Sequence, residues 1–310
     1  MAAVVAIALL AGLVAAGHGA PAHPVECNVL AGERGANVWE RAKIPQLRRY
    51  CALVASASAK LTPGSRMVGD VVRLADEAEA LVPGRAAPMV LKGRALCQLA
   101  RHAEAKVSLR LARERDAHAL DDPATLFAWA RVLASTGDAA GARDAYRDLL
   151  PRSDALPLAD RGVAYVGSGV LALQAGPAAI GNAVAILRQA RHDSQDVLRS
   201  AATFLLALAL DRSGDTGEAA TVIAEEGANE AVEVMTDPRV LDAMGKGGEA
   251  EARAAVALAR EVEGDRAAAL TAWQAYVASG ACGGVWEAHA RSHLAARART
   301  GAPRHPAGHP

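Results

Sequence analysis

The stretch that decides the fold is LFAWARVLASTGDAAGARDAY, which runs from Leu126 to Tyr146. Apolar residues recur at helical spacing on both sides of a central Gly-Asp pair, so we expect two helices joined by a tight bend. Small residues stand at Ala130 and Ala142, and a large one stands at Leu133. A small residue on each helix lets the two helices approach closely, while large residues fill the adjacent holes. The stretch therefore predicts a helix-turn-helix unit.

The same unit recurs along the chain at a nearly constant spacing. A small residue marks each first helix, and the markers stand roughly 38 residues apart, at Gly93, Ala130, Gly169 and Ala207. The Gly-Asp bend returns at residues 214–215 and 264–265. This order of small, large, Gly, Ala and aromatic residues resembles the tetratricopeptide repeat family over about residues 65–280. The resemblance implies an all-α, right-handed superhelical solenoid of helix-turn-helix repeats.

Composition favours the same fold class and argues against nucleic acid as a partner. The 310 residues carry 34 Lys and Arg against 34 Asp and Glu, and only 3% are aromatic. A balanced charge leaves no basic excess to neutralise phosphates, and few aromatic rings are left to stack on bases. About a quarter of the residues are Ala, the best helix former, whereas β-branched and aromatic residues are scarce. Closely packed helices are therefore expected.

The first 22 residues differ from the rest of the chain. Residues 2–16 are apolar, no charged side chain precedes Glu26, and small-residue cleavage patterns end at Ala16 and Ala22. The apolar run is shorter than the roughly 20 residues that span a bilayer, so residues 1–22 are predicted to be a signal peptide. The mature protein is then periplasmic or secreted, with no stable membrane span. Because no Lys or Arg precedes the run, an uncleaved N-terminus on a membrane-anchored or cytoplasmic scaffold stays open.

The remaining chain divides into four predicted parts. A solenoid needs end caps with a polar outer face, and a Pro- and His-rich terminus has little to bury. The parts are an N-terminal helical segment or cap at 23–64, the repeats at 65–249 with an insertion near 229–248, the last repeat with a C-terminal capping helix at 250–299, and a disordered tail at 300–310.

Four cysteines in an exported chain permit three complete pairings, and the sequence alone does not choose among them. Cys27 and Cys51 lie in the same N-terminal segment outside the repeats, so we predict a disulfide between them. The alternative is that all four are small buried thiols. Cys282 stands between glycines that a turn explains, and nothing nearby specifies the base that a nucleophilic cysteine needs. No catalytic residue is predicted.

Two histidines raise the question of a metal site. His289 and His293 stand four residues apart on a predicted helix, so both imidazoles can face one ion. No third ligand at a suitable spacing is evident, and Arg291 stands between them. We therefore predict a solvated helix face and no metal or cofactor, with an envelope metal-binding or enzyme-accessory protein as the alternative. The stretch from Met244 to Gly248 lacks the pattern of a phosphate loop and predicts a flexible turn.

The resemblance to tetratricopeptide repeats also implies a binding surface. In that family the first helix of each repeat lines a concave groove that takes peptides. Two arginines fall at equivalent positions of adjacent repeats and could hold a peptide carboxylate; the alternative is that both pair with Asp or Glu of the chain itself. The groove residues carried over are Val90, Arg94, Gln98, Phe127, Arg131, Ser135, Val166, Val170, Gln174, Phe204, Leu208 and Arg212.

The function expected from these observations is binding without catalysis. The chain is predicted to be a protein–protein interaction scaffold of a bacterial-type cell envelope, which holds a peptide or protein segment in its concave groove. The apolar stripe of Val166, Val170, Phe204 and Leu208 has a second interpretation, which is ordinary packing between repeats.

Overall fold

The computed structural model describes residues 27, 38–62, 65–280 and 284–300, and all regular structure within them is helical. The all-α prediction is confirmed. Short 3-10 turns η2 to η4 cover Leu150–Ala155, Pro177–Ala179 and Ala228–Glu230. The α-helices are α1 (Val38–Lys60), α2 (Val68–Leu81), α3 (Ala86–Gln98), α4 (His102–Arg115), α5 (Pro123–Thr136), α6 (Ala139–Leu149), α7 (Leu158–Gln174), α8 (Ile180–Asp193), α9 (Asp196–Ser213), α10 (Thr216–Glu226), α11 (Ala231–Thr236), α12 (Pro238–Met244), α13 (Gly248–Glu263), α14 (Arg266–Ala278) and α15 (Glu287–Thr300).

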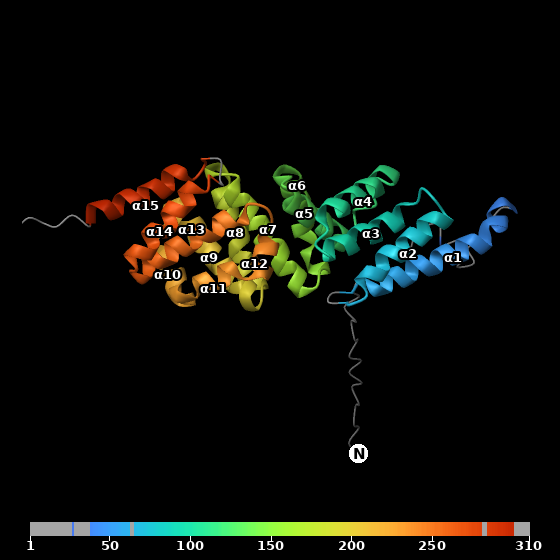
Figure 1. Cartoon of the computed structure of the whole chain (residues 1–310), viewed down its shortest axis with the longest axis horizontal. Coiled ribbons are helices and arrows are strands. Elements are labelled where there is room, and N and C mark those ends of the chain that lie inside the picture. Colours follow the sequence, from blue (N-terminus) through green and yellow to red (C-terminus); the bar gives the residue numbers. More distant parts are fainter. Residues whose placement is uncertain (1–26, 28–37, 63–64, 281–283, 301–310) are drawn as a thin grey trace, which may run out of the picture.

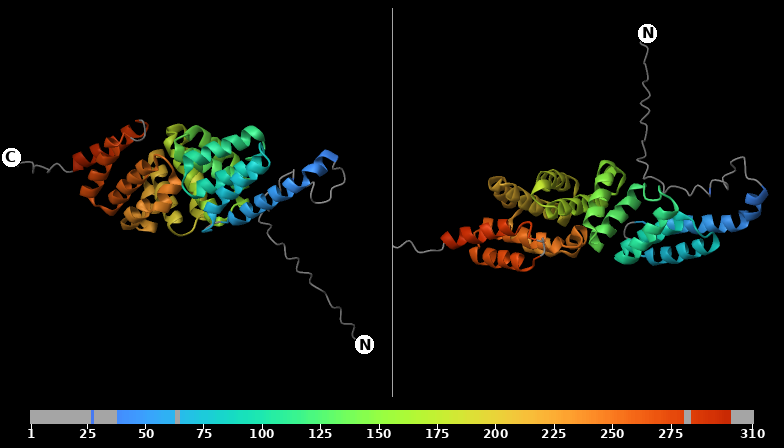
Figure 2. Two further views of the ribbon diagram at one scale, coloured as in Figure 1. Left: turned by 45° about the vertical axis from the view of Figure 1, so that its right-hand side comes forward. Right: turned by 90° about the horizontal axis from the view of Figure 1, so that it is seen from above.

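Most helices pack against the helix that follows them in sequence. The pairs α1/α2, α3/α4, α5/α6, α7/α8, α9/α10 and α13/α14 each form an extensive contact, and α15 packs on α14. Figure 1 shows the pairs following one another along the long axis, with α1 at one end and α15 at the other. Figure 2 shows the same order from two other sides.

The bends inside three of these pairs share one geometry. Each begins with a glycine in the left-handed region, where a side chain would be strained. The aspartate that follows caps the next helix, because its carboxylate accepts a hydrogen bond from a backbone N–H of the first turn. The pairs of residues are Gly137 and Asp138, Gly214 and Asp215, and Gly264 and Asp265.

Small residues bring paired helices close together. A Cβ added to Gly93 of α3 would lie 2.5 Å from Leu109 of α4, and one added to Gly169 of α7 would lie 2.5 Å from Leu187 of α8. Both leucines are fully buried. The glycines that mark the predicted repeats therefore stand where a neighbouring side chain fills the space that a larger residue would need.

The buried apolar side chains form three clusters in chain order. The first gathers residues 27–95, the second residues 96–171, and the third residues 166–290. Since each cluster is built mainly from neighbouring helix pairs, the core extends along the molecule rather than around one centre. Between α10 and α13 the chain leaves this pattern and forms η4, α11 and α12, where an insertion was predicted near 229–248.

The N-terminal end carries a covalent link. Cys27 and Cys51 form a disulfide across 24 residues of sequence, as predicted, and Cys27 is buried in the cluster that contains Tyr50 and Val54. Residues 1–22, predicted to be a signal peptide, lie outside the described residues, as do residues 301–310 of the predicted tail. In the described part of the chain, no helix combines the length and apolar character needed to cross a membrane.

Candidate functional site

The insertion, defined here as residues 228–247, folds back onto earlier helices. Its helix α12 contacts α5, α7 and α9, which are first helices of three pairs, and Figure 1 shows α12 beside α7. Val240, Ala243 and Met244 of α12 are buried. The face on which an open groove was predicted is therefore covered by a segment of the same chain.

Local sequence explains how α12 begins and ends. The carboxylate of Asp237 accepts a hydrogen bond from the N–H of Arg239 at 2.7 Å, and Pro238 stands in the first turn, where its missing N–H is not needed. Gly245 and Gly247 follow with φ of 69° and 84°, a region that favours glycine. The glycine-rich stretch thus forms the turn that joins α12 to α13.

Close backbone contacts hold this turn and the end of α12 in place. The N–H of Lys246 donates to the carbonyl of Ala134 in α5 at 3.2 Å. A Cβ added to Gly167 of α7 would lie 2.8 Å from the carbonyl oxygen of Ala243, so α7 has a glycine where the backbone of α12 approaches. The fit depends on small residues on both sides of the contact.

Asp242 of α12 contacts two basic side chains. Its carboxylate accepts a short, charge-assisted hydrogen bond from Arg131 of α5 and lies 4.0 Å from Nε2 of His102 of α4. The Arg131 side chain is only 17% exposed, and its guanidinium lies 5.6 Å from the ring centre of Phe127. Burial lowers the pKa of His102, and the charge of Arg131 lowers it further, against the opposing effect of Asp242.

The second arginine of the predicted carboxylate clamp is also paired. Arg94 of α3 lies 3.6 Å from the carboxylate of Asp122, which caps α5 by accepting a hydrogen bond from the N–H of Thr125 at 2.9 Å. Both Arg94 and Arg131 therefore face carboxylates of the chain itself, which is the alternative that the sequence left open.

Several predicted groove residues cannot line an open groove. The side chains of one set are buried because helix packing and the insertion cover them: Phe127, Val166, Val170, Phe204 and Leu208. Arg212 is buried as well, in an ion pair with Glu251 and a hydrogen bond of 3.0 Å to the Tyr276 hydroxyl. The remaining members keep some exposure: Val90, Arg94, Gln98, Arg131, Ser135 and Gln174. The apolar stripe is packing, as its second interpretation held.

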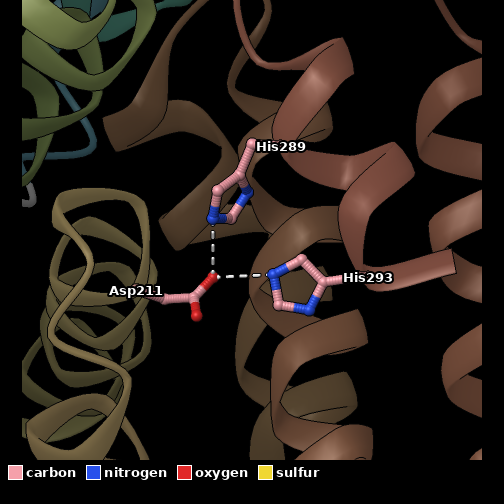
Figure 3. Close-up of side chains that lie close together, drawn as sticks. All are labelled: Asp211, His289 and His293. Atoms are coloured by element: carbon pink, nitrogen blue, oxygen red, sulfur yellow. Dashed lines mark hydrogen bonds and ion pairs between the residues drawn. The ribbon is translucent and has the colours of Figure 1, made fainter. Parts of the chain in front are cut away.

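A second cluster of polar side chains lies between α9 and α15. Figure 3 shows His289 and His293 of α15 directed at Asp211 of α9. The Nε2 atoms of both imidazoles lie 3.1 Å from the same carboxylate oxygen, Oδ2 of Asp211. The side chains are 2% exposed for Asp211, 20% for His289 and 15% for His293. The prediction of a solvated helix face for the two histidines is wrong.

Neighbouring side chains fix both rings. The Nδ1 of His293 lies 2.8 Å from Oε2 of Glu261 on α13, and the Trp273 ring stacks on the His293 ring at 4.6 Å between centres. The indole N–H of Trp273 donates to Glu261 at 3.0 Å. Trp286 lies edge-on to His289 at 6.1 Å between ring centres. Four helices, α9, α13, α14 and α15, therefore contribute to the cluster.

The contacts shift two pKa values in opposite directions. Burial lowers the pKa of His293, but its hydrogen bonds to Asp211 and Glu261 outweigh this and raise the pKa to about 9. Burial raises the pKa of Asp211, but the hydrogen bonds from His289 and His293 dominate and lower it to about 2. These contacts therefore favour a protonated His293 beside an ionised Asp211.

Sequence reasoning found the two histidines and missed the carboxylates. Asp211 ends the apolar run that starts at Phe204, and a charge at the end of such a buried run was the available signal. Glu261 offered none. Cys97 is a buried free thiol, and Cys282 lies outside the described residues.

No family model matches the sequence, and no curated protein matches it. The tetratricopeptide interpretation therefore stands on the residue pattern and on the helix pairs with their shared Gly-Asp bends.

Proposed function

We propose that this chain is an exported, non-catalytic scaffold of tetratricopeptide-like repeats, which binds a short helical segment of a partner protein. The repeats would form a right-handed solenoid whose inner face comprises the first helices of the pairs. Support comes from the recurring Gly-Asp bends and from the glycines at the closest helix contacts. Export is supported by the apolar N-terminal run and by the Cys27–Cys51 disulfide, since disulfides persist in oxidising compartments.

One observation carries the binding proposal, which is the position of α12. A short helix with an apolar side already lies on α5, α7 and α9 and places Asp242 on Arg131. The surface is thus shaped for a helix that combines small apolar residues with one acidic side chain. We infer that a partner segment of this chemistry competes with the insertion for the same face.

Arg131 has a hydrogen-bond donor that Asp242 does not engage. Its Nε is buried and has no hydrogen-bond partner among the described residues, while one of its Nη atoms contacts Asp242. A guanidinium binds a carboxylate best through two parallel hydrogen bonds. A partner carboxylate that reaches Nε as well would therefore bind more strongly than Asp242, so displacement of α12 is physically reasonable.

A peptide-binding experiment tests this proposal. A labelled peptide with the sequence of residues 231–247 is titrated onto the full-length protein and onto the Asp242→Ala variant, with fluorescence anisotropy as the readout. The variant loses the Arg131 contact of its own α12, so we expect it to bind the peptide about tenfold more tightly than the unmodified protein does.

Matched controls distinguish binding at this site from non-specific peptide binding. Asp76→Ala removes an exposed carboxylate that pairs with Lys92 elsewhere, and it should leave peptide affinity unchanged. A peptide carrying the Asp242→Lys change should bind neither protein, because it places a cation on Arg131. Absence of peptide binding to an Asp242→Ala variant of unchanged helicity would refute the proposed role of this face.

A further inference from the structure

The cluster between α9 and α15 has the ligand set of a metal centre. Nε2 of His289, Nε2 of His293 and Oδ2 of Asp211 lie within 4.8 Å of one another, and both nitrogens are 3.1 Å from the oxygen. Zinc bonds of about 2.0–2.1 Å to nitrogen and oxygen in a tetrahedron place neighbouring ligand atoms about 3.3 Å apart. Both nitrogen–oxygen separations are close to that value, and the two nitrogens lie within 4.8 Å of each other, so an ion could be admitted by shifts of the imidazoles.

The contacts of His293 show how its ring is oriented toward the cluster. A neutral imidazole carries one proton, and Nδ1 of His293 faces the carboxylate of Glu261 at 2.8 Å. If Nδ1 donates that proton to Glu261, the lone pair of Nε2 points at Oδ2 of Asp211, which is also an acceptor. Two acceptors at 3.1 Å repel each other unless a proton or a metal ion lies between them.

A metal ion can take the place of the protons at this junction. Protons on the two Nε2 atoms would let both imidazoles donate to Asp211, whereas one divalent ion accepts lone pairs from both imidazoles and from Asp211 at once. Within the described part of the chain, no Lys or Arg pairs with Asp211, whose side chain is 2% exposed. A carboxylate that orients a metal-bound histidine through its other nitrogen, as Glu261 is placed to do, is the usual second layer of such sites.

We propose that Asp211, His289 and His293 bind one Zn²⁺ ion, with Glu261 as the residue that positions His293. Two imidazoles and a carboxylate suit zinc better than the oxygen-seeking ions Mg²⁺ and Ca²⁺. Three protein ligands leave the fourth tetrahedral position for water. The ion joins the end of α9 to α15 across 82 residues of sequence and so fixes the last helix on the repeats.

Zinc titration of the full-length protein tests the proposal. Protein stripped of metal with EDTA and dialysed is titrated with ZnCl₂ in competition with a chromophoric chelator. We expect one equivalent to bind with a Kd below about 1 μM and the melting temperature to rise as the site fills. Co²⁺ in place of Zn²⁺ should give the intense visible bands of a tetrahedral complex. Lack of stoichiometric binding, or weak octahedral Co²⁺ bands in the unmodified protein, would overturn the assignment.

Variants locate the ion. Asp211→Asn and His293→Ala should each weaken zinc binding by at least about 100-fold, and Glu261→Gln by about 10–100-fold, because Glu261 acts through His293. His118→Ala removes an exposed histidine that also pairs with an aspartate, and it should leave the affinity unchanged. Circular dichroism shows whether each variant keeps its helices. Unchanged zinc affinity in a folded Asp211→Asn or His293→Ala variant rules out this site.

Discussion

At the scale of single residues, Asp242 supplies the charged contacts of the insertion with α5 and α4. It faces the largely covered Arg131 and His102 together, so one carboxylate from α12 links α5 and α4. The arrangement is asymmetric, because the guanidinium of Arg131 keeps its charge at every accessible pH whereas His102 adds charge only on acidification. Protonation of His102 places a second cation beside Arg131, which burial makes costly.

The pH dependence of stability should show the effect of His102. Its folded pKa is lowered, so the unfolded chain binds the proton more readily. The stability contribution is fully present above the unfolded pKa of about 6.5, and it is lost as pH falls below that value by at most about 1.4 kcal/mol per pH unit. Comparing urea unfolding of the unmodified protein and His102→Gln between pH 7.5 and 5.5 measures this. The variant should lose less stability on acidification. An identical change of unfolding free energy with pH in both proteins would contradict the role given to His102.

At the scale of elements, two local devices shape the helix pairs: a Gly-Asp bend in α5/α6, α9/α10 and α13/α14, and a glycine at the closest helix contact in α3/α4 and α7/α8. The Gly-Asp bend ends one helix and caps the next, and a small residue allows the two to meet. Both devices are local in sequence, which is why the pairs could be predicted from the pattern of residues 126–146. The same cannot be said of α11 and α12, which are too short to show a helical period.

Two glycine substitutions should have opposite effects on stability. Gly169→Ala puts a methyl group 2.5 Å from Leu187, so overpacking of about 1–3 kcal/mol outweighs the helix-propensity gain of up to about 1 kcal/mol. Gly181→Ala in the partner helix α8 meets nothing within 4 Å, so only the gain remains. Chemical unfolding midpoints should fall for the first variant and hold or rise for the second. A rise for both would show that α7 and α8 are not packed as closely as described.

At the scale of the whole molecule, contacts between residues close in sequence could be predicted, whereas contacts between distant residues could not. The helix pairs and the Cys27–Cys51 bridge join residues that are near one another in the chain. The position of α12 on α5, α7 and α9 includes the Arg131–Asp242 contact across 111 residues, and the histidine cluster joins Asp211 to His293 across 82 residues. Composition and residue spacing do not predict such contacts, because these contacts depend on how successive helix pairs pack on one another. Open groove residues and a solvated histidine face were therefore natural expectations.

The extended core predicts that the effect of the disulfide is confined to one end. Cys27 and Cys51 belong to the first apolar cluster, which α1 and α2 share with α3, whereas α13 to α15 belong to the third. In the loop-entropy model a bridge across 24 residues stabilises by about 3 kcal/mol. In a chain of stacked helix pairs, the stability lost when the disulfide is reduced should stay near the N-terminal end.

Hydrogen exchange with and without reductant checks whether the effect of the disulfide is confined to the N-terminal end. Amides of α1 and α2 should lose protection on reduction, while those of α13 to α15 keep theirs. The Cys27→Ser/Cys51→Ser double variant should show the reduced pattern under both conditions, which excludes effects of reductant elsewhere. Loss of protection along the whole chain would mean that the molecule unfolds as one cooperative unit, and the picture of a core that extends from pair to pair would then be wrong.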